Sequence, residues 1–150
     1  MKVNKPLFAI SSCLFGEKVR YDAKLKALPA KELQQISKEV QLLPICPEVA
    51  IGLSIPRPPL QLRQYVDGYH AVVIENPALD YTQALRNYAA QLLKQNPELK
   101  GCILKQKSPS CGTGKTKLYD REGQLQALDG WGIFADELRR LKPELIIKSE

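Results

Sequence analysis

Three short apolar runs, each leading to a cysteine, constrain the fold of this chain more than any other feature. Leu7-Phe8-Ala9-Ile10 leads to Cys13, Leu42-Leu43-Pro44-Ile45 leads to Cys46, and Gly101-Cys102-Ile103-Leu104 precedes the loop that contains Cys111. Runs of this length and composition are typical of buried strands. Because the carboxyl ends of parallel strands meet in one crevice of an open α/β sheet, we expect the three sulfurs to converge.

Helical patterns lie between the expected strands. Leu33, Ile36 and Val40 recur at helical spacing in residues 29–40, and a longer apolar stripe begins near residue 80 and stops near Asn96-Pro97. We expect strands at residues 7–12, 41–45, 101–105 and 145–147, a hairpin within 62–74, a short strand and turn at 117–123, and a last helix entered from 129–138. This alternation predicts an α/β fold with a mostly parallel sheet flanked by helices.

The bulk properties fit one domain spanning residues 1–150. The chain has 150 residues, 44% of them apolar, which is enough for one sizeable core. It shows neither the apolar core of a signal peptide nor a run long enough to span a membrane, so we expect a cytoplasmic protein with no membrane partner. The formal charge of +6 would attract anions, nucleotides or RNA, although a solvated basic surface explains it more simply.

The cysteines allow several kinds of chemistry. None lies in a close C-x-x-C pair, so the fold must assemble any shared site. A zinc site would need a fourth ligand such as Glu48, whereas three thiolates on a cubane iron–sulfur cluster leave one iron open to a substrate. A redox pair, a cysteine nucleophile or three merely structural cysteines remain alternatives. The lone His70 lies in an apparent strand, which argues against a Cys–His hydrolase, and Cys102 is expected in the core.

Polar residues beside these cysteines are candidates for acid–base work. Glu48 lies two residues after Cys46, and Ser108 and Ser110 precede Cys111. A carboxylate in a partly desolvated pocket can exchange protons near neutral pH. Nearby Lys105, Lys107 and Lys115 are expected to favour the thiolate of Cys111. The proline-rich stretch after Cys46 is expected to form a pocket wall that presents Arg57.

Six sequence motifs, taken together, carry a family resemblance. They are Ile10-Ser11-Ser12-Cys13-Leu14; Val19-Arg20-Tyr21-Asp22; Cys46-Pro47-Glu48 with Gly52-Leu53 and Pro56-Arg57-Pro58-Pro59; Asp67-Gly68; Ser108-Pro109-Ser110-Cys111-Gly112; and Gly130-Trp131-Gly132. In this order they resemble the YbbK-like domain family, which includes bacterial thiouracil desulfidases. Two departures are Ala23-Lys24-Leu25-Lys26, where a glycine-rich segment is common, and the extra thiol of Cys102.

The resemblance implies a Rossmann-like domain that holds a [4Fe-4S] cluster on Cys13, Cys46 and Cys111. The implied reaction replaces C=S by C=O in a thiolated pyrimidine such as 2-thiouracil, with water as the oxygen donor and no net redox change. Glu48 and Ser108 would handle protons and orient the substrate. Ser12, Arg57 and Ser110 are predicted to contact the substrate.

The sequence is also compatible with other functions. Sulfur could be removed from thiolated tRNA bases, which would make use of the positive charge, or the chain could be a non-catalytic iron–sulfur or zinc module. A thiolated nucleobase is the expected small-molecule partner, tRNA is an alternative partner, and a monomer is the expected oligomeric state.

Overall fold

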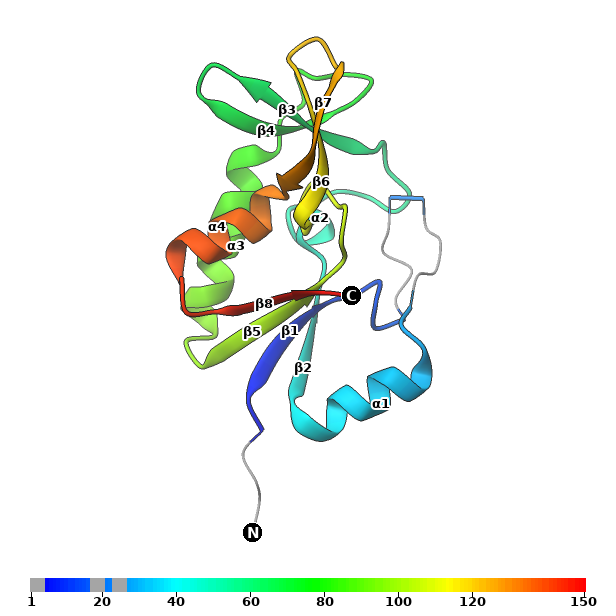
Figure 1. Ribbon diagram of the computed structural model, residues 1–150, viewed down its shortest axis with the longest axis vertical. Coiled ribbons are helices and arrows are strands. Elements are labelled where there is room, and N and C mark those ends of the chain that lie inside the picture. The colour runs from blue at the N-terminus through cyan, green and yellow to red at the C-terminus, as the bar shows by residue number, and fades with distance from the viewer. Residues whose placement is uncertain (1–4, 17–20, 23–26) are drawn as a thin grey trace.

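A parallel sheet forms the lower half of the molecule in Figure 1, which shows a computed structural model that describes residues 5–16, 21–22 and 27–150. Its four strands have the order β2-β1-β5-β8, and all neighbouring pairs are parallel. The strands are β1 (Leu7–Ser11), β2 (Gln41–Ile45), β5 (Leu99–Leu104) and β8 (Ile146–Ser149). The expected α/β class with a parallel sheet flanked by helices is therefore confirmed.

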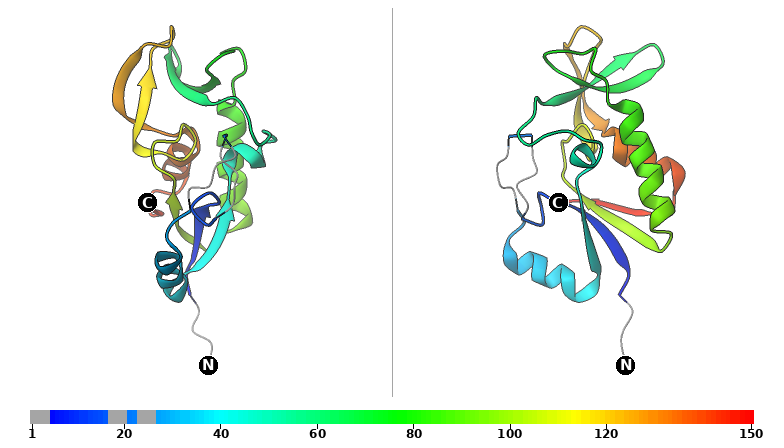
Figure 2. Two further views of the ribbon diagram at one scale, coloured as in Figure 1. Left: turned by 90° about the vertical axis from the view of Figure 1, so that its right-hand side faces the viewer. Right: turned by 180° about the vertical axis from the view of Figure 1, so that it is seen from behind.

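Helices cover both faces of this sheet. The helix α1 (Ala30–Glu39) lies on one face, where its Leu33 packs against a small cluster that includes Ile10 of β1. The helices α3 (Thr82–Gln95) and α4 (Ile133–Leu141) cover the other face (Figure 2). The alternation of side chains along β1 explains the division, because Ala9 faces the α3 and α4 side while Ile10 faces α1.

A second sheet, which the sequence pattern does not predict, forms the upper half of the molecule (Figures 1 and 2). Its order is β4-β3-β6-β7, and only the β3–β6 pair is parallel. The strands are β3 (Leu60–Tyr65), β4 (Gly68–Val73), β6 (Thr113–Tyr119) and β7 (Leu125–Trp131). The hairpin of β3 and β4 turns at the expected Asp67-Gly68, whereas β7 occupies a stretch that sequence analysis left without a strand.

The helix α3 connects the cores of the two sheets. Leu85 near its start packs in the core of the second sheet, and Ala89 and Leu92 one and two turns later pack in the core of the first. These positions belong to the apolar stripe expected from the sequence. The two sheets are therefore joined through one continuous helix face.

The register of the parallel sheet aligns the points at which its strands end. Ser11 of β1 lies opposite Ile45 of β2, and Ile10 lies opposite Ile103 of β5. Cys46 follows β2 directly, and Cys13 lies two residues beyond β1. The carboxyl ends of β1, β2 and β5 therefore lie next to one another at one edge of the sheet.

His70 of β4 lies between two carboxylates that tie the hairpin to α3. Its Nδ1 is 2.6 Å from Asp80 Oδ2, and its Nε2 is 2.8 Å from Asp67 Oδ1. Asp80 Oδ1 also accepts a hydrogen bond from the backbone N–H of Thr82. Partial burial lowers the pKa of His70, but the hydrogen bonds and charges of Asp80 and Asp67 outweigh this effect, so the pKa is raised above its ordinary value.

This arrangement predicts a pH-dependent contribution to stability. Because the folded-state pKa of His70 is raised, its contribution is complete below the ordinary pKa of about 6.5 and is lost as the pH rises through the folded-state value. The cluster is exposed to solvent, so His70→Gln should lower the Tm by only about 2 °C at pH 6 and by nothing at pH 9. Thermal unfolding at both pH values checks this, and an equal loss at each would contradict it.

Among the described residues, no helix combines the length and the apolar character needed to cross a membrane.

Candidate functional site

A cavity of about 460 Å³ lies at the carboxyl ends of β1, β2 and β5. Cys13, Cys46 and Cys111 all line it, together with Glu48 and Arg57. The three cysteines come from sequence positions far apart, and the parallel sheet brings the strand ends that precede them to one cavity. The expected convergence of the three thiols on one crevice is thus present in the structure.

The loop that carries Cys111 is held by the first turn of α4. The N–H groups of Gly132, Ile133 and Ala135 donate hydrogen bonds of 2.8–3.1 Å to the carbonyls of Gly112, Pro109 and Ser110 respectively. The first N–H groups of a helix have no partner within the helix. The loop therefore satisfies these donors, and α4 in turn fixes the loop that forms one side of the cavity.

Gly132 allows this close approach. A Cβ at this position would lie 2.4 Å from the carbonyl carbon of Ser110 and 2.7 Å from the nitrogen of Cys111, and these backbone atoms cannot move aside without moving the loop. Gly132→Ala should therefore destabilise the chain by about 1–3 kcal/mol and reduce binding of the iron–sulfur cluster that the family resemblance implies. Denaturant unfolding and the iron content after anaerobic reconstitution would measure the two effects.

Gly68→Ala provides a control for this prediction. Gly68 has a φ of 126°, so alanine there is strained, but no atom lies within 4 Å of the added Cβ at this hairpin position. It should lose stability without losing bound iron. Normal iron content in Gly132→Ala would show that the loop does not depend on this glycine.

The hydroxyl of Ser108 organises the turn before Cys111. Its Oγ accepts hydrogen bonds from the backbone N–H groups of Ser110, at 3.1 Å, and Cys111, at 3.0 Å. The Oγ atoms of Ser108 and Ser110 are 2.9 Å apart. Ser108 thus fixes the backbone of the loop and joins a chain of hydroxyl groups.

Glu48 lies at the end of this chain and is buried. The short helix α2 (Pro47–Ala50) begins immediately after Cys46 and positions Glu48. Glu48 Oε2 accepts a hydrogen bond of 3.0 Å from Ser110 Oγ, and Oε1 accepts one of 2.9 Å from Arg57 Nε. Ser110 Oγ can donate to Glu48 Oε2 or to Cys111 Sγ, 3.8 Å away, and Ser108 Oγ already accepts two backbone N–H groups, so the proton between the two serines comes from Ser108.

Arg57 and Ser12 both line the cavity, as predicted, but Arg57 is already engaged. Its side chain is 4% exposed, its Nε binds Glu48, and its Nη1 donates to the carbonyl of Ser54 at 3.0 Å. The guanidinium therefore holds the carboxylate in place. Ser12 is buried, and its backbone N–H donates to the carbonyl of Ile45 at 2.6 Å.

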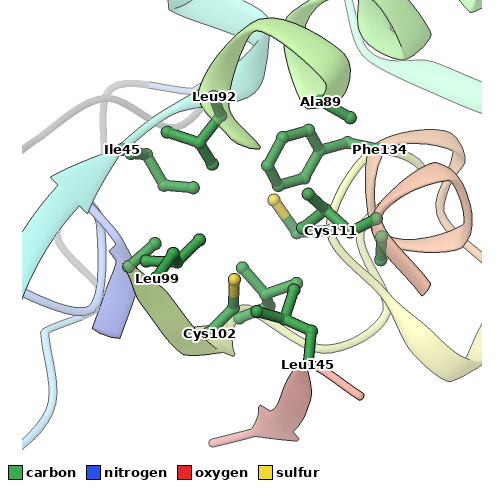
Figure 3. Packing of buried hydrophobic residues seen from close by; sticks show 12 residues of the cluster. Ile45, Ala89, Leu92, Leu99, Cys102, Cys111, Phe134 and Leu145 are labelled. Carbon is green, nitrogen blue, oxygen red and sulfur yellow. The ribbon is translucent and has the colours of Figure 1, made fainter. Parts of the chain in front are cut away.

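Cys111 is buried more deeply than its polar neighbours in the sequence suggest. It belongs to the apolar cluster that contains Phe134 of α4, and Figure 3 shows its sulfur beside that ring. Burial raises the pKa of the Cys111 thiol, which corrects the expectation that nearby lysines favour the thiolate. Burial likewise raises the pKa of Cys46. Any metal centre that bound these thiols would therefore have to displace their protons.

Cys102 lies in the same apolar cluster but outside the cavity lining, as expected for a core residue (Figure 3). It is fully buried in β5, and burial raises its pKa to about 12. This thiol thus provides an internal comparison for Cys111.

Sequence analysis assigned no role in binding or catalysis to several residues that line the cavity. Ser11 accepts a hydrogen bond from the backbone N–H of Lys105 at 2.9 Å and hydrogen-bonds to the Cys111 thiol. Tyr21, Gln106 and Lys107 also line the cavity. The signal available for Ser11 was its position at the end of the first apolar run. The motif residues Val19 and Arg20 and the segment 23–26 lie outside the described residues.

The fold and the cavity define an α/β domain with three thiols in one site. A sequence model of the 2-thiouracil desulfurase family matches residues 8–150, so the chain belongs to that family. It is 27% identical over 151 residues to the uncharacterized protein YbbK of Bacillus subtilis (strain 168), covering 96% of this chain and 97% of that protein. The solved structure of the [4Fe-4S]-dependent thiouracil desulfidase TudS matches with a TM-score of 0.75 and 34% identity, covering 99% of this chain and 91% of the other.

Proposed function

We propose that this protein is a [4Fe-4S]-dependent desulfidase that converts the C=S group of a thiolated pyrimidine to C=O, with water as co-substrate and sulfide as the second product. The observation that carries the proposal is the convergence of Cys13, Cys46 and Cys111 on one cavity that also contains a buried carboxylate. Family membership and the similarity to TudS support the same reaction class. We propose that residues 1–150 form one desulfidase domain.

The donor set suits a cluster. Cys13, Cys46 and Cys111 would hold three irons through thiolates, which are the usual ligands of cubane clusters. The described part of the chain contains no group of three His, Cys, Asp or Glu side chains that could hold a single metal ion. When bound, such a cluster would supply an open, thiophilic iron that polarises the thiocarbonyl and accepts its sulfur.

Glu48 is positioned to handle the protons of the reaction. Water must lose protons as its oxygen bonds to carbon, and a carboxylate within hydrogen-bonding reach can accept one. Arg57 holds Oε1, and Ser110 contacts Oε2, so the carboxylate has one fixed orientation at the cavity wall. Water gives up two protons in total while the ring nitrogens keep their own, so a proton received by Glu48 can leave with the sulfide.

Ser108 and Ser110 extend this network toward the thiols. The hydroxyl order established above, from Ser108 to Ser110 to Glu48, aligns all three groups along one side of the cavity. Ser108 Oγ accepts hydrogen bonds from two backbone N–H groups and donates to Ser110, so Ser108 is proposed to orient the substrate by fixing the loop, whereas Ser110 Oγ keeps one lone pair for the substrate. Ser12 is proposed to contact the pyrimidine, and Arg57 is proposed to act on it through Glu48.

The test is anaerobic reconstitution with iron and sulfide, followed by an iron count, a visible spectrum and addition of 2-thiouracil. A brown protein with about four irons that forms uracil and sulfide in equal amounts would support the proposal. A colourless protein that retains zinc and shows no turnover would favour a non-catalytic metal-binding module.

Thiolated tRNA is a second candidate substrate because the formal charge of the chain is +6. Binding of thiolated tRNA that weakens steeply with salt, together with loss of its sulfur, would favour it over a free pyrimidine. The monomeric state and the cytoplasmic location stay predictions from the sequence.

A further inference from the structure

Glu150 contacts the stem of the Cys111 loop through three of its groups. Its backbone N–H donates to the carbonyl of Leu104 at 3.3 Å, and its Oε2 accepts a hydrogen bond of 2.7 Å from the backbone N–H of Gln106. Its Oε1 forms an ion pair with Lys105 Nζ. The two side chains of this pair are only 14% and 25% exposed, so solvent screens their attraction less than it would on an open surface.

The same stem is held from its other side by β1. The backbone N–H of Lys105 donates to Ser11 Oγ at 2.9 Å, and Ser11 ends β1 just before Cys13. Lys105 and Gln106 both line the cavity. Two cavity residues are therefore fixed between the ends of β1 and β8, and Figure 1 shows the C-terminus at this end of the parallel sheet.

The chain changes direction directly after Lys105 and Gln106. Lys107 has a φ of 65°, in the left-handed region that non-glycine residues seldom adopt. A residue in this conformation persists only where its surroundings determine it. The fixed residues before Lys107 and the Ser108 hydroxyl after it provide those surroundings.

We propose that Glu150 is a positioning residue that fixes the Lys105–Gln106 wall of the cavity and neutralises the Lys105 ammonium beside it. As a statement about substrate binding this rests on the proposed function, whereas the anchor itself exists in the ligand-free chain. Glu150 is far from the reacting groups in sequence and does not line the cavity among the described residues. It acts through the two residues that do.

The first measurement is amide hydrogen exchange of the ligand-free full chain. In Glu150→Ala the amide of Gln106 loses its acceptor, so peptides that contain residues 105–107 should exchange about tenfold faster. Glu150→Gln keeps an oxygen acceptor but loses the charge, and its exchange should fall between wild type and Glu150→Ala. Glu144→Ala is the matched control, because Glu144 is exposed and lies before β8. Equal exchange in Glu150→Ala and Glu144→Ala would overturn the proposal.

The second measurement separates positioning from general stabilisation. A misplaced wall should raise KM about tenfold for 2-thiouracil while kcat and iron content stay near wild type, whereas a loss of folded protein would lower kcat at constant KM. In a Lys105→Met background, Glu150→Gln should have little further effect, because the charge it loses no longer has a partner. An unchanged KM in Glu150→Ala would show that Glu150 does not position the Lys105–Gln106 wall of the cavity.

These outcomes are independent of those for the proposed function. If the wild-type chain shows no desulfuration but Glu150→Ala accelerates exchange, the anchor stands and the desulfidase assignment fails. If the wild type is active and exchange is unchanged, the assignment stands and the anchor fails.

Discussion

Cys111→Ser is expected to yield a folded chain that binds almost no iron after reconstitution and shows no detectable desulfuration. Serine has nearly the size of cysteine, so the loop held by Ser108 and α4 should persist. A serine hydroxyl is a much poorer ligand for iron in such clusters than a thiolate, and two remaining thiolates are too few to retain one. Iron content should fall from about four per chain to well below one, with loss of the visible absorption.

The matched control is Cys102→Ser. Cys102 and Cys111 are both buried in the same apolar cluster, so both substitutions place a hydroxyl among the same side chains (Figure 3). Of Cys102 and Cys111, only Cys111 lines the cavity. Cys102→Ser should therefore cost stability, by about 1–3 kcal/mol, while retaining iron and turnover. Full iron content in Cys111→Ser, or loss of iron in Cys102→Ser with the fold intact, would overturn the assignment of ligands.

The convergence of the cysteines could be predicted from the sequence because it depends on local pattern and on one general rule. Apolar runs of strand length end shortly before Cys13 and at Cys46, and helical stripes separate the runs. Parallel strands connected by helices bring their carboxyl ends together. The register of Ser11 with Ile45 then places the strand ends that lead to the two cysteines next to each other.

The second sheet could not be predicted in the same way. Most residues of β7 are exposed, including Leu125 and Leu128, so the strand shows no alternation between apolar and polar residues. Its pairing with β6 also shifts register at several points. A strand that buries little of its surface leaves only a weak signal in sequence, and its assignment depends on its partner.

The burial of Cys111 and the ion pair between Glu48 and Arg57 could likewise not be predicted from the sequence. The residues next to Cys111 are polar, and the apolar contact comes from Phe134, more than twenty positions later in the chain. Arg57 reaches Glu48 because the intervening segment turns back on itself, with Leu53 N–H donating to the Glu48 carbonyl. Both contacts depend on tertiary structure, so neither the residue types nor their spacing in the sequence predicts them.

Glu48→Gln is expected to retain the cluster and to lower kcat by about 10²–10⁴-fold, which is the usual contribution of a positioned proton acceptor. The three cysteines are untouched, so iron content and the visible spectrum should match wild type. The glutamine carbonyl can accept the hydrogen bond from Arg57, and its amide can donate to Ser110. Ser110 Oγ then accepts from both the amide and Ser108, and its own proton turns toward Cys111 Sγ, 3.8 Å away.

The substitution also removes the charge that balances a buried guanidinium, so the variant should lose about 2–4 kcal/mol of stability. Ser110→Ala separates this effect from catalysis, because it leaves the ion pair intact and removes the hydroxyl that links Glu48 to Ser108 and contacts Cys111 Sγ. If proton handling depends on the network, Ser110→Ala should lower kcat by about tenfold at nearly normal stability. Wild-type turnover in a folded, iron-loaded Glu48→Gln variant would show that Glu48 only braces Arg57, and the proton acceptor would then have to be sought among the other groups that line the cavity.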